Sequence, residues 1–169
     1  MCYTEKQRGG IGMKLHRVLK WIVRLPVLLM ALVVLYEVVG LAVNHAASAQ
    51  QTRDIVRTLR AGLSQVEIVD RYTETGNTAG TGNHVDMLSA VILRTESGWE
   101  EIIKVCQKYD GLDEWSFWVK SMEEVKAARE KYPGIYPFLE EMAVPGGAED
   151  CWFLYMNTSA PFVNNIEGH

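Results

Sequence analysis

The sequence predicts an α+β protein with an N-terminal transmembrane helix, a juxtamembrane amphipathic helix and a small antiparallel sheet of about four strands. Three observations carry this prediction: a long apolar stretch near the N-terminus, later segments in the order β-β-α-β-α-β, and a composition of 48% hydrophobic and 22% charged residues in 169. That composition is typical of a folded domain and excludes a disordered, collagen-like or disulfide-dense chain. The later segments favour one sheet with a helix packed on it.

The charge of the chain is divided unevenly between its two ends. Residues 1–49 carry a formal charge of +4 and residues 50–169 a charge of −8, which together give the net charge of −4. The basic residues of the acidic part are scattered and form no stripe that could neutralise successive phosphates. We therefore expect no nucleic-acid partner, and we expect the two parts to face different surroundings.

The apolar stretch covers residues 21–43, WIVRLPVLLMALVVLYEVVGLAV, and contains only two charged residues, Arg24 and Glu37. A helix needs roughly 20 apolar residues to span a bilayer. Each charge lies near one end of the stretch, where it can reach the headgroups. Basic residues concentrate before the stretch, which by the positive-inside rule places residues 1–20 in the cytoplasm and the remainder of the chain outside. We expect a single-pass protein in contact with the lipid bilayer.

A cleavable signal peptide is the alternative interpretation of the same stretch. Ala47, Ser48 and Ala49 supply the small residues that signal peptidase requires, so the chain could be secreted after cleavage following Ala49. The apolar stretch is longer than the roughly 7 to 15 residues of a typical signal peptide, which favours a retained signal anchor. A third alternative, a buried core helix, is disfavoured by the flanking basic residues.

Met13 is a second candidate for the start of translation. Arg8, Gly9 and Gly10 can be encoded by a purine run that resembles a bacterial ribosome-binding sequence, and MKLHRVLKW from Met13 resembles the start of an exported protein. Residues 1–12 show no periodicity and no apolar face, so we expect no folded element there.

The segment after the apolar stretch is predicted to be a linker followed by an amphipathic helix. Residues 44–51 are mostly small, whereas residues 52–66 carry apolar residues at helical spacing: Ile55, Val56, Leu59, Leu63 and Val66. The extracytoplasmic domain is therefore expected over residues 52–169. Three arginines lie on the polar side of this helix, surrounded either by anionic headgroups or by water: Arg53, Arg57 and Arg60.

Two strand-like segments, residues 66–73 and 85–95, predict a β-hairpin with a long Gly-rich loop over residues 74–84. The second segment, VDMLSAVILRT, is apolar on both faces. Such a strand is covered on both sides, so we expect it to be central in the sheet.

Two capping boxes predict the starts of two helices. Ser97 with Glu100 opens a helix whose apolar stripe includes Cys106 and which Gly111 would end. Ser121 with Glu124 opens a second helix that ends before Tyr132 and Pro133. Strands are expected at residues 114–119 and 150–156, and the tail, residues 157–169, lacks periodicity.

The Gly-rich loop and the strand start after it form a weak candidate for ligand binding: Gly80, Gly82, Asn83, His84 and Asp86. The glycines could offer backbone N–H groups to an anion, but neither a Walker loop nor a dinucleotide loop has this spacing, which favours a structural hairpin loop. His84 and Asp86 are two residues apart on a strand and therefore share a face. They could serve as two metal ligands or as a base with its carboxylate. A zinc site needs further ligands, so we expect no metal ion and no cofactor.

The two cysteines outside the membrane segment, Cys106 and Cys151, are tentatively predicted to form a disulfide. The alternative is a pair of buried thiols. The aromatic residues on the predicted helix and strands are expected to share one core: Trp99, Trp115, Phe117, Trp152 and Phe153. Replacing Trp152 by Ala is then expected to cost about 3–5 kcal/mol.

For function, these features favour a non-catalytic accessory, sensor or binding module of a bacterial cell envelope, with an envelope protein or a wall component as its partner. The alternative is a small extracytoplasmic enzyme or metal-dependent hydrolase that uses His84 and Asp86. No GxSxG nucleophile elbow occurs in the sequence. Cys106 lies on an apolar stripe, where a nucleophilic thiolate is disfavoured.

Overall fold

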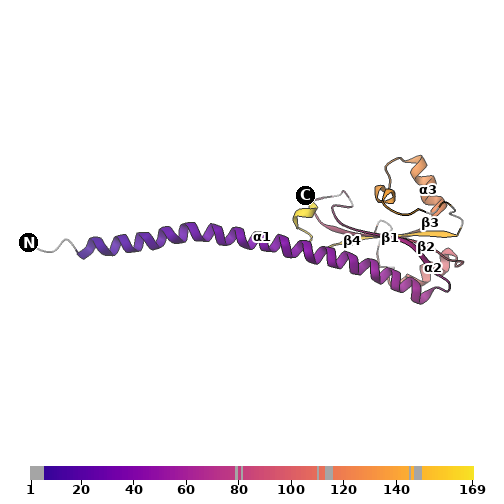
Figure 1. Cartoon of the computed structure of the whole chain (residues 1–169), viewed down its shortest axis with the longest axis horizontal. Coiled ribbons are helices and arrows are strands. Elements are labelled where there is room, and N and C mark those ends of the chain that lie inside the picture. Colours follow the sequence, from indigo (N-terminus) through magenta and orange to yellow (C-terminus); the bar gives the residue numbers. More distant parts are fainter. Residues whose placement is uncertain are drawn as a thin grey trace, which may run out of the picture. The chain divides into compact units, whose positions relative to one another are not determined.

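The computed structural model describes residues 6–78, 80, 82–109, 111–112, 116–144, 146 and 150–169, with side chains from residue 20 onward. They form two units, of which the first ends at Val39 and the second comprises Gly40–His169. The elements labelled in Figure 1 are α1 (Lys6–Gly62), β1 (Glu67–Gly76), β2 (Asp86–Arg94), α2 (Trp99–Val105), β3 (Phe117–Ser121), α3 (Met122–Lys131) and β4 (Cys151–Ser159). Three short 3-10 turns occur at Gln107–Tyr109 (η1), Pro137–Glu140 (η2) and Ile166–Gly168 (η3).

The N-terminal part of α1 presents its apolar side chains to the surroundings. Trp21 is 68% exposed and Met30 is 70% exposed. By length and composition, α1 is the one helix in the described part of the chain that could cross a membrane, and only 6% of its apolar window is buried. This exposure contradicts a core helix, but a signal sequence near the N-terminus would show the same properties.

The predicted linker at 44–51 is wrong, because these residues belong to α1, which continues without a break to Gly62. These residues stay helical because their polar side chains lie on the buried side of the helix. Asn44, Ser48 and Thr52 recur every four residues and are buried. They face the rest of the domain, so the second unit begins at Gly40 rather than at residue 52.

A four-stranded antiparallel sheet in the order β1-β2-β4-β3 forms the centre of the second unit. The predicted hairpin is confirmed, and β1 extends to Gly76, into the segment expected to be loop. β2 lies between β1 and β4, as its two apolar faces predicted. In the register, Ala90 lies opposite both Tyr72 and Tyr155.

The two faces of the sheet carry separate hydrophobic clusters. The C-terminal part of α1 and α2 cover one face, and α3 with η2 covers the other (Figure 1). Alternation along β2 supplies both clusters, since Val91 and Leu93 face α1 whereas Ala90 and Ile92 face α3. The α1 face also receives Ile55, Leu59 and Leu63 of the predicted amphipathic helix.

The two predicted capping boxes differ in outcome. Ser97 does not cap α2, which begins one residue later with Gly98 as its N-cap, and α2 ends at Val105, well before Gly111. The box at Ser121 is confirmed, because Ser121 Oγ accepts from the Glu124 N–H at 3.2 Å and Glu124 Oε2 accepts from the Ser121 N–H at 2.9 Å.

Replacing Ser121 by Ala is expected to lower the free energy of unfolding by about 1 kcal/mol, because the first turn of α3 loses its side-chain acceptor. Chemical denaturation of the full chain in detergent measures the loss. Ser121→Asp keeps an acceptor at the same place and should retain most of the stability. Equal losses in the two variants would contradict the capping role.

The predicted disulfide between Cys106 and Cys151 is wrong. No disulfide joins the two thiols, which are buried in different clusters on opposite faces of the sheet. The sequence placed Cys106 correctly on the inward side of its helix. Cys151, however, starts β4 with its side chain on the face away from α2. The sheet therefore lies between the two sulfurs.

The expected aromatic core is only partly formed. Phe153 is fully buried on the α3 face, whereas Trp152 and Phe117 pack partly buried on the α1 face. Trp99 is 50% exposed, and its indole N–H donates to the Val119 carbonyl at 3.3 Å. Trp115, like Glu114, lies outside the described residues. The aromatic residues therefore divide between two cores and the surface.

Candidate functional site

His84 and Asp86 form the pair that the sequence singled out. His84 Nε2 lies 3.0 Å from Asp86 Oδ1, and the Asp86 side chain is 6% exposed against 35% for His84. The expected shared face is thus confirmed. The geometry matches a buried carboxylate that orients an imidazole at the domain surface.

The C-terminal tail closes around this pair. The Val85 N–H donates to the Val163 carbonyl at 2.8 Å, and the Ala160 N–H donates to the Val85 carbonyl at 2.9 Å. A Cβ at Gly168 would lie 2.7 Å from the backbone carbonyl carbon of His84. This close approach requires glycine and holds His84 against the tail.

The loop glycines do not converge on the pair as a ligand cradle. Gly80 has φ +64 and nothing within 4 Å of the place a Cβ would occupy. Its N–H donates to the Asn77 carbonyl at 3.3 Å, as in an ordinary turn. Gly82 and Asn83 are exposed, and the Cβ position of Gly82 lies 3.3 Å from His84 Nδ1. Among the described residues, no third His, Cys, Asp or Glu joins the pair in a metal-binding group.

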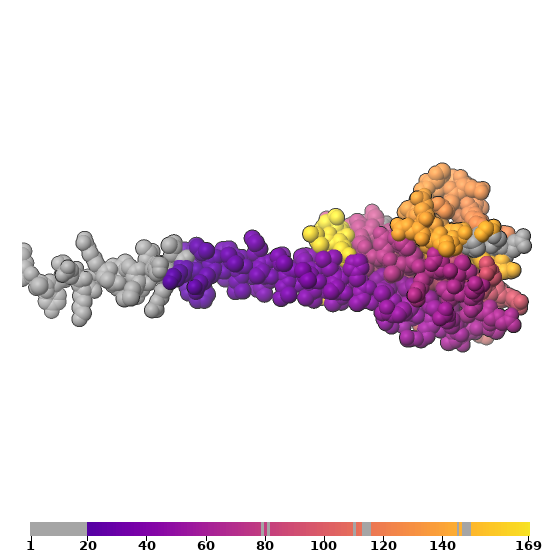
Figure 2. Space-filling model, viewed as in Figure 1, coloured from indigo at the N-terminus to yellow at the C-terminus, as the bar shows by residue number. Residues whose placement is uncertain are grey.

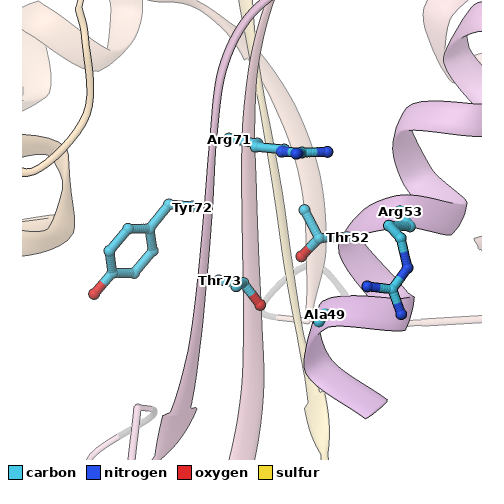
Figure 3. Close-up of a pocket in the computed structure, with 6 residues that line it drawn as sticks. All are labelled: Ala49, Thr52, Arg53, Arg71, Tyr72 and Thr73. Atoms are coloured by element: carbon cyan, nitrogen blue, oxygen red, sulfur yellow. The ribbon is translucent and has the colours of Figure 1, made fainter. Parts of the chain in front are cut away.

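A second candidate site is a pocket of about 220 Å³ between α1 and the edge strand β1 (Figure 3). Ala49, Thr52 and Arg53 line it from the helix, and Arg71, Tyr72 and Thr73 line it from the strand. Figure 3 shows Arg71 and Thr73 on the side of β1 that faces α1, with the Tyr72 ring on the opposite side. Helical spacing singled out Arg53, whereas the position of Arg71 depends on the strand register.

Two arginines in this pocket lack a carboxylate partner within the described part of the chain. Arg57 pairs with Asp54, Arg94 with Glu67, and Arg129 with Glu140. Arg53 Nη2 instead donates to the neutral Gln50 Oε1 at 3.1 Å, and no carboxylate of a described residue forms an ion pair with Arg71. The pocket is therefore electropositive in a domain whose net charge is negative.

Hydroxyl and amide groups join α1 to β1 and β2 beside the pocket. Ser48 Oγ lies 2.7 Å from Thr73 Oγ1, and Thr52 Oγ1 lies 2.7 Å from Ser89 Oγ. Gln51 Nε2 donates to the Met87 carbonyl and to Ser89 Oγ, each at 3.1 Å. These hydrogen bonds attach α1 to β1 and β2. The backbone positions of Arg53 and Arg71 are therefore fixed relative to each other.

Tyr72 is an uncharged group at neutral pH. Burial of the ring, and then the Glu74 carboxylate, raise the pKa of Tyr72 to about 12. Its hydroxyl donates to Glu74 Oε2 at 3.1 Å, and its ring stacks on Phe138 with 5.6 Å between centroids. Tyr72 thus serves packing on the α3 face and contributes no charge near the arginines.

The C-terminal tail also binds the helix near the start of the domain, which the sequence did not predict. The Phe162 N–H donates to Asn44 Oδ1 at 2.9 Å, and Asn44 Nδ2 donates to the Phe162 carbonyl at 3.1 Å. A Cβ at Gly40 would lie 2.5 Å from Asn165 Nδ2. His45 Nε2 lies 2.8 Å from Glu167 Oε1. Figure 2 shows the tail, in yellow, against α1.

Comparison with known proteins adds no assignment to these two sites. No protein-family model, no curated protein and no solved structure matches the chain.

Proposed function

We propose that the protein is a single-pass membrane protein of a bacterial cell envelope whose domain acts outside the membrane as a non-catalytic binding module. Residues 21–43 contact the lipid bilayer and residues 1–20 lie in the cytoplasm. The partner of the domain is an envelope protein or a wall component. The basic residues before the apolar stretch support this orientation.

The observation that supports a retained anchor is the set of contacts that Gly40, Asn44 and Ser48 make inside the domain. Cleavage after Ala49 would remove all three residues. It would remove the Asn44 side chain, which bonds both the N–H and the carbonyl of Phe162. Removing a hydrogen-bond partner of a buried backbone group costs about 1–3 kcal/mol. The helix is therefore a structural part of the domain, which a removable leader would not be.

The same contacts argue against the surface-bound basic helix considered above. Arg60 lies seventeen residues beyond Val43 on one continuous helix, which is about 25 Å along the axis. The Debye length at physiological ionic strength is about 8 Å. With α1 across the bilayer, Arg57 and Arg60 lie beyond the electrostatic reach of the headgroups and face water.

Cysteine labelling in spheroplasts tests the orientation. The labelling uses chains with Cys2 replaced by Ser, because Cys2 would also react after lysis. Cys106 and Cys151 are 1% and 2% exposed, so they give little background. Glu123→Cys, on an exposed position of α3, should react with a membrane-impermeant maleimide in intact spheroplasts. Lys14→Cys, before the apolar stretch, should react only after lysis. The reverse pattern would contradict the proposed orientation.

The non-catalytic role is supported by the weakness of the chemistry around His84. One imidazole with one carboxylate provides two of the ligands that a catalytic zinc site requires, where three protein ligands are usual. The arginine pocket offers binding groups but no base or nucleophile. We therefore favour a binding module over the metal-dependent hydrolase.

A thermal shift with divalent metal ions separates the two functions. The binding module predicts that Zn²⁺, Mn²⁺ or Ca²⁺ leaves the melting temperature of the full chain in detergent unchanged. His84→Ala should then behave like the wild type with and without metal. A metal-dependent rise that His84→Ala abolishes would instead favour the hydrolase.

A further inference from the structure

We propose that the pocket between α1 and β1 binds a phosphate group, held between Arg53 on the helix and Arg71 on the strand. Both side chains line this pocket. Phosphate binding there goes beyond the proposed function and depends neither on the anchor nor on the orientation of the chain, whereas the choice of an aqueous source rests on the proposed anchor.

The pocket carries positive charge that no carboxylate of a described residue compensates. Three of the six arginines after residue 50 pair with carboxylates, and all three pairs lie elsewhere. Arg53 and Arg71 line the same pocket without an acidic partner in the part of the chain that the structure describes. Two like charges on facing elements repel each other unless an anion lies between them. An anion in this pocket would therefore bind with electrostatic gain.

The guanidinium groups of the two pocket arginines match the geometry of phosphate oxygens. A guanidinium offers a planar fork of N–H groups that matches two oxygens of a carboxylate or a phosphate. One arginine already satisfies a carboxylate with such a fork. Two arginines from different elements supply two forks, which suit the several oxygens of a phosphate group better. The pocket is thus better matched to phosphate than to carboxylate.

The pocket is large enough to hold a phosphate group. The volume open to the centre of a water-sized sphere is about 220 Å³ in the pocket. A single water molecule needs about 10–15 Å³ on the same measure. The pocket volume is enough for a phosphate group and part of the molecule that carries it. Thr52 and Thr73 also line the pocket, and their hydroxyls lie 2.7 Å from Ser89 Oγ and Ser48 Oγ respectively.

The phosphate could belong to a soluble or wall-borne molecule or to a lipid headgroup. Arg53 lies ten residues beyond Val43 along α1, which is about 15 Å along the helix axis. That distance exceeds the reach of headgroup electrostatics at physiological ionic strength. We therefore assign the site to a phosphate that approaches from the aqueous side.

Isothermal titration of the full chain with inorganic phosphate, in nanodiscs of zwitterionic lipid and at constant ionic strength, tests the proposal. Wild type should bind phosphate saturably and acetate more weakly. Arg53→Gln and Arg71→Gln should each weaken phosphate binding by about tenfold or more, as expected for the loss of one charge-assisted fork. Arg60→Gln is the matched control, because Arg60 is exposed on the same helix and outside the pocket. It should leave the affinity unchanged.

The proposal is overturned if wild type shows no saturable binding, if either pocket variant keeps the wild-type affinity, or if Arg60→Gln weakens binding as much as they do. Acetate binding as tight as phosphate binding would overturn the choice of phosphate. Each variant should have the wild-type melting temperature without phosphate, since both pocket arginines are exposed. Repeating the titration in nanodiscs with anionic lipid separates the two sources. An unchanged affinity supports the aqueous source, and a competitive loss assigns the site to headgroups.

Discussion

Phe153→Ala is expected to lower the free energy of unfolding by about 3–5 kcal/mol, because it removes the largest fully buried side chain among the described residues. Its ring lies 5.4 Å from Trp118 and 6.1 Å from Phe138, centroid to centroid. The substitution leaves a cavity between β4, β3 and η2. Two-state chemical denaturation of the full chain in detergent measures the loss.

Trp99→Ala is the matched control for this prediction, since Trp99 was expected in the same core and is 50% exposed in the structure. Its loss removes some surface packing and one hydrogen bond to the Val119 carbonyl. The cost should be about 1 kcal/mol or less. A larger loss for Trp99→Ala than for Phe153→Ala would contradict the arrangement of the two cores.

Asn44→Leu is expected to destabilise the domain by about 2–5 kcal/mol. Asn44 is fully buried and pairs with both backbone groups of Phe162. Leucine cannot replace either hydrogen bond, and removing a hydrogen-bond partner of a buried backbone group costs about 1–3 kcal/mol. Amide hydrogen exchange should show the selective effect, with faster exchange in residues 160–169 than in β2.

The neighbouring substitution Ala46→Ser tests whether this effect is specific to the buried face of the helix. Ala46 lies two residues away on the exposed side. Serine there should change stability by about 0.5 kcal/mol or less and leave the exchange of the tail unaltered. A tail that stays protected in Asn44→Leu would contradict the role of Asn44 as its attachment point.

The strands of the sheet could be predicted from the sequence because the alternation of apolar residues lies within each short segment. The alternation along β2, apolar on both faces, gave both the strand and its central position. The hairpin could be predicted from two strand-like segments on either side of a glycine-rich loop. The capping box at Ser121 was correct because the reciprocal bonds lie within one turn. Its counterpart at Ser97 was wrong, since Gly98 takes the N-cap position.

The continuity of α1 through residues 44–51 and the attachment of the tail to it were missed, because the partners of these residues are distant in sequence. Asn44 and Ser48 were assigned to a linker because a search for apolar periodicity ignores polar residues that bond to a sheet. A signal was present, since Asn44, Ser48 and Thr52 continue the stripe of Ile55 and Leu59 at helical spacing. What could not be foreseen is that Thr73, Ser89 and Phe162 would supply their partners.

The candidate sites divide in the same way. The His84 and Asp86 pair is a short-range feature, and its contact follows from the spacing of two residues, although His84 precedes β2, which begins at Asp86. The arginine pocket requires knowing that β1 is an edge strand beside α1 and that Arg71 lies opposite Val91, on the face toward the helix. The sequence alone contained Arg53 and Arg71 as unrelated charges.

The intact mass of the protein recovered from cell membranes tests the central claim, that α1 is a retained anchor built into the domain. Cells expressing the untagged chain are fractionated, the membranes are washed with alkaline carbonate, and the protein is measured by mass spectrometry. We predict that it stays with the washed membranes and that its mass includes residues 21–49. A protein that begins at Gln50 and is recovered in the soluble fraction would contradict the account.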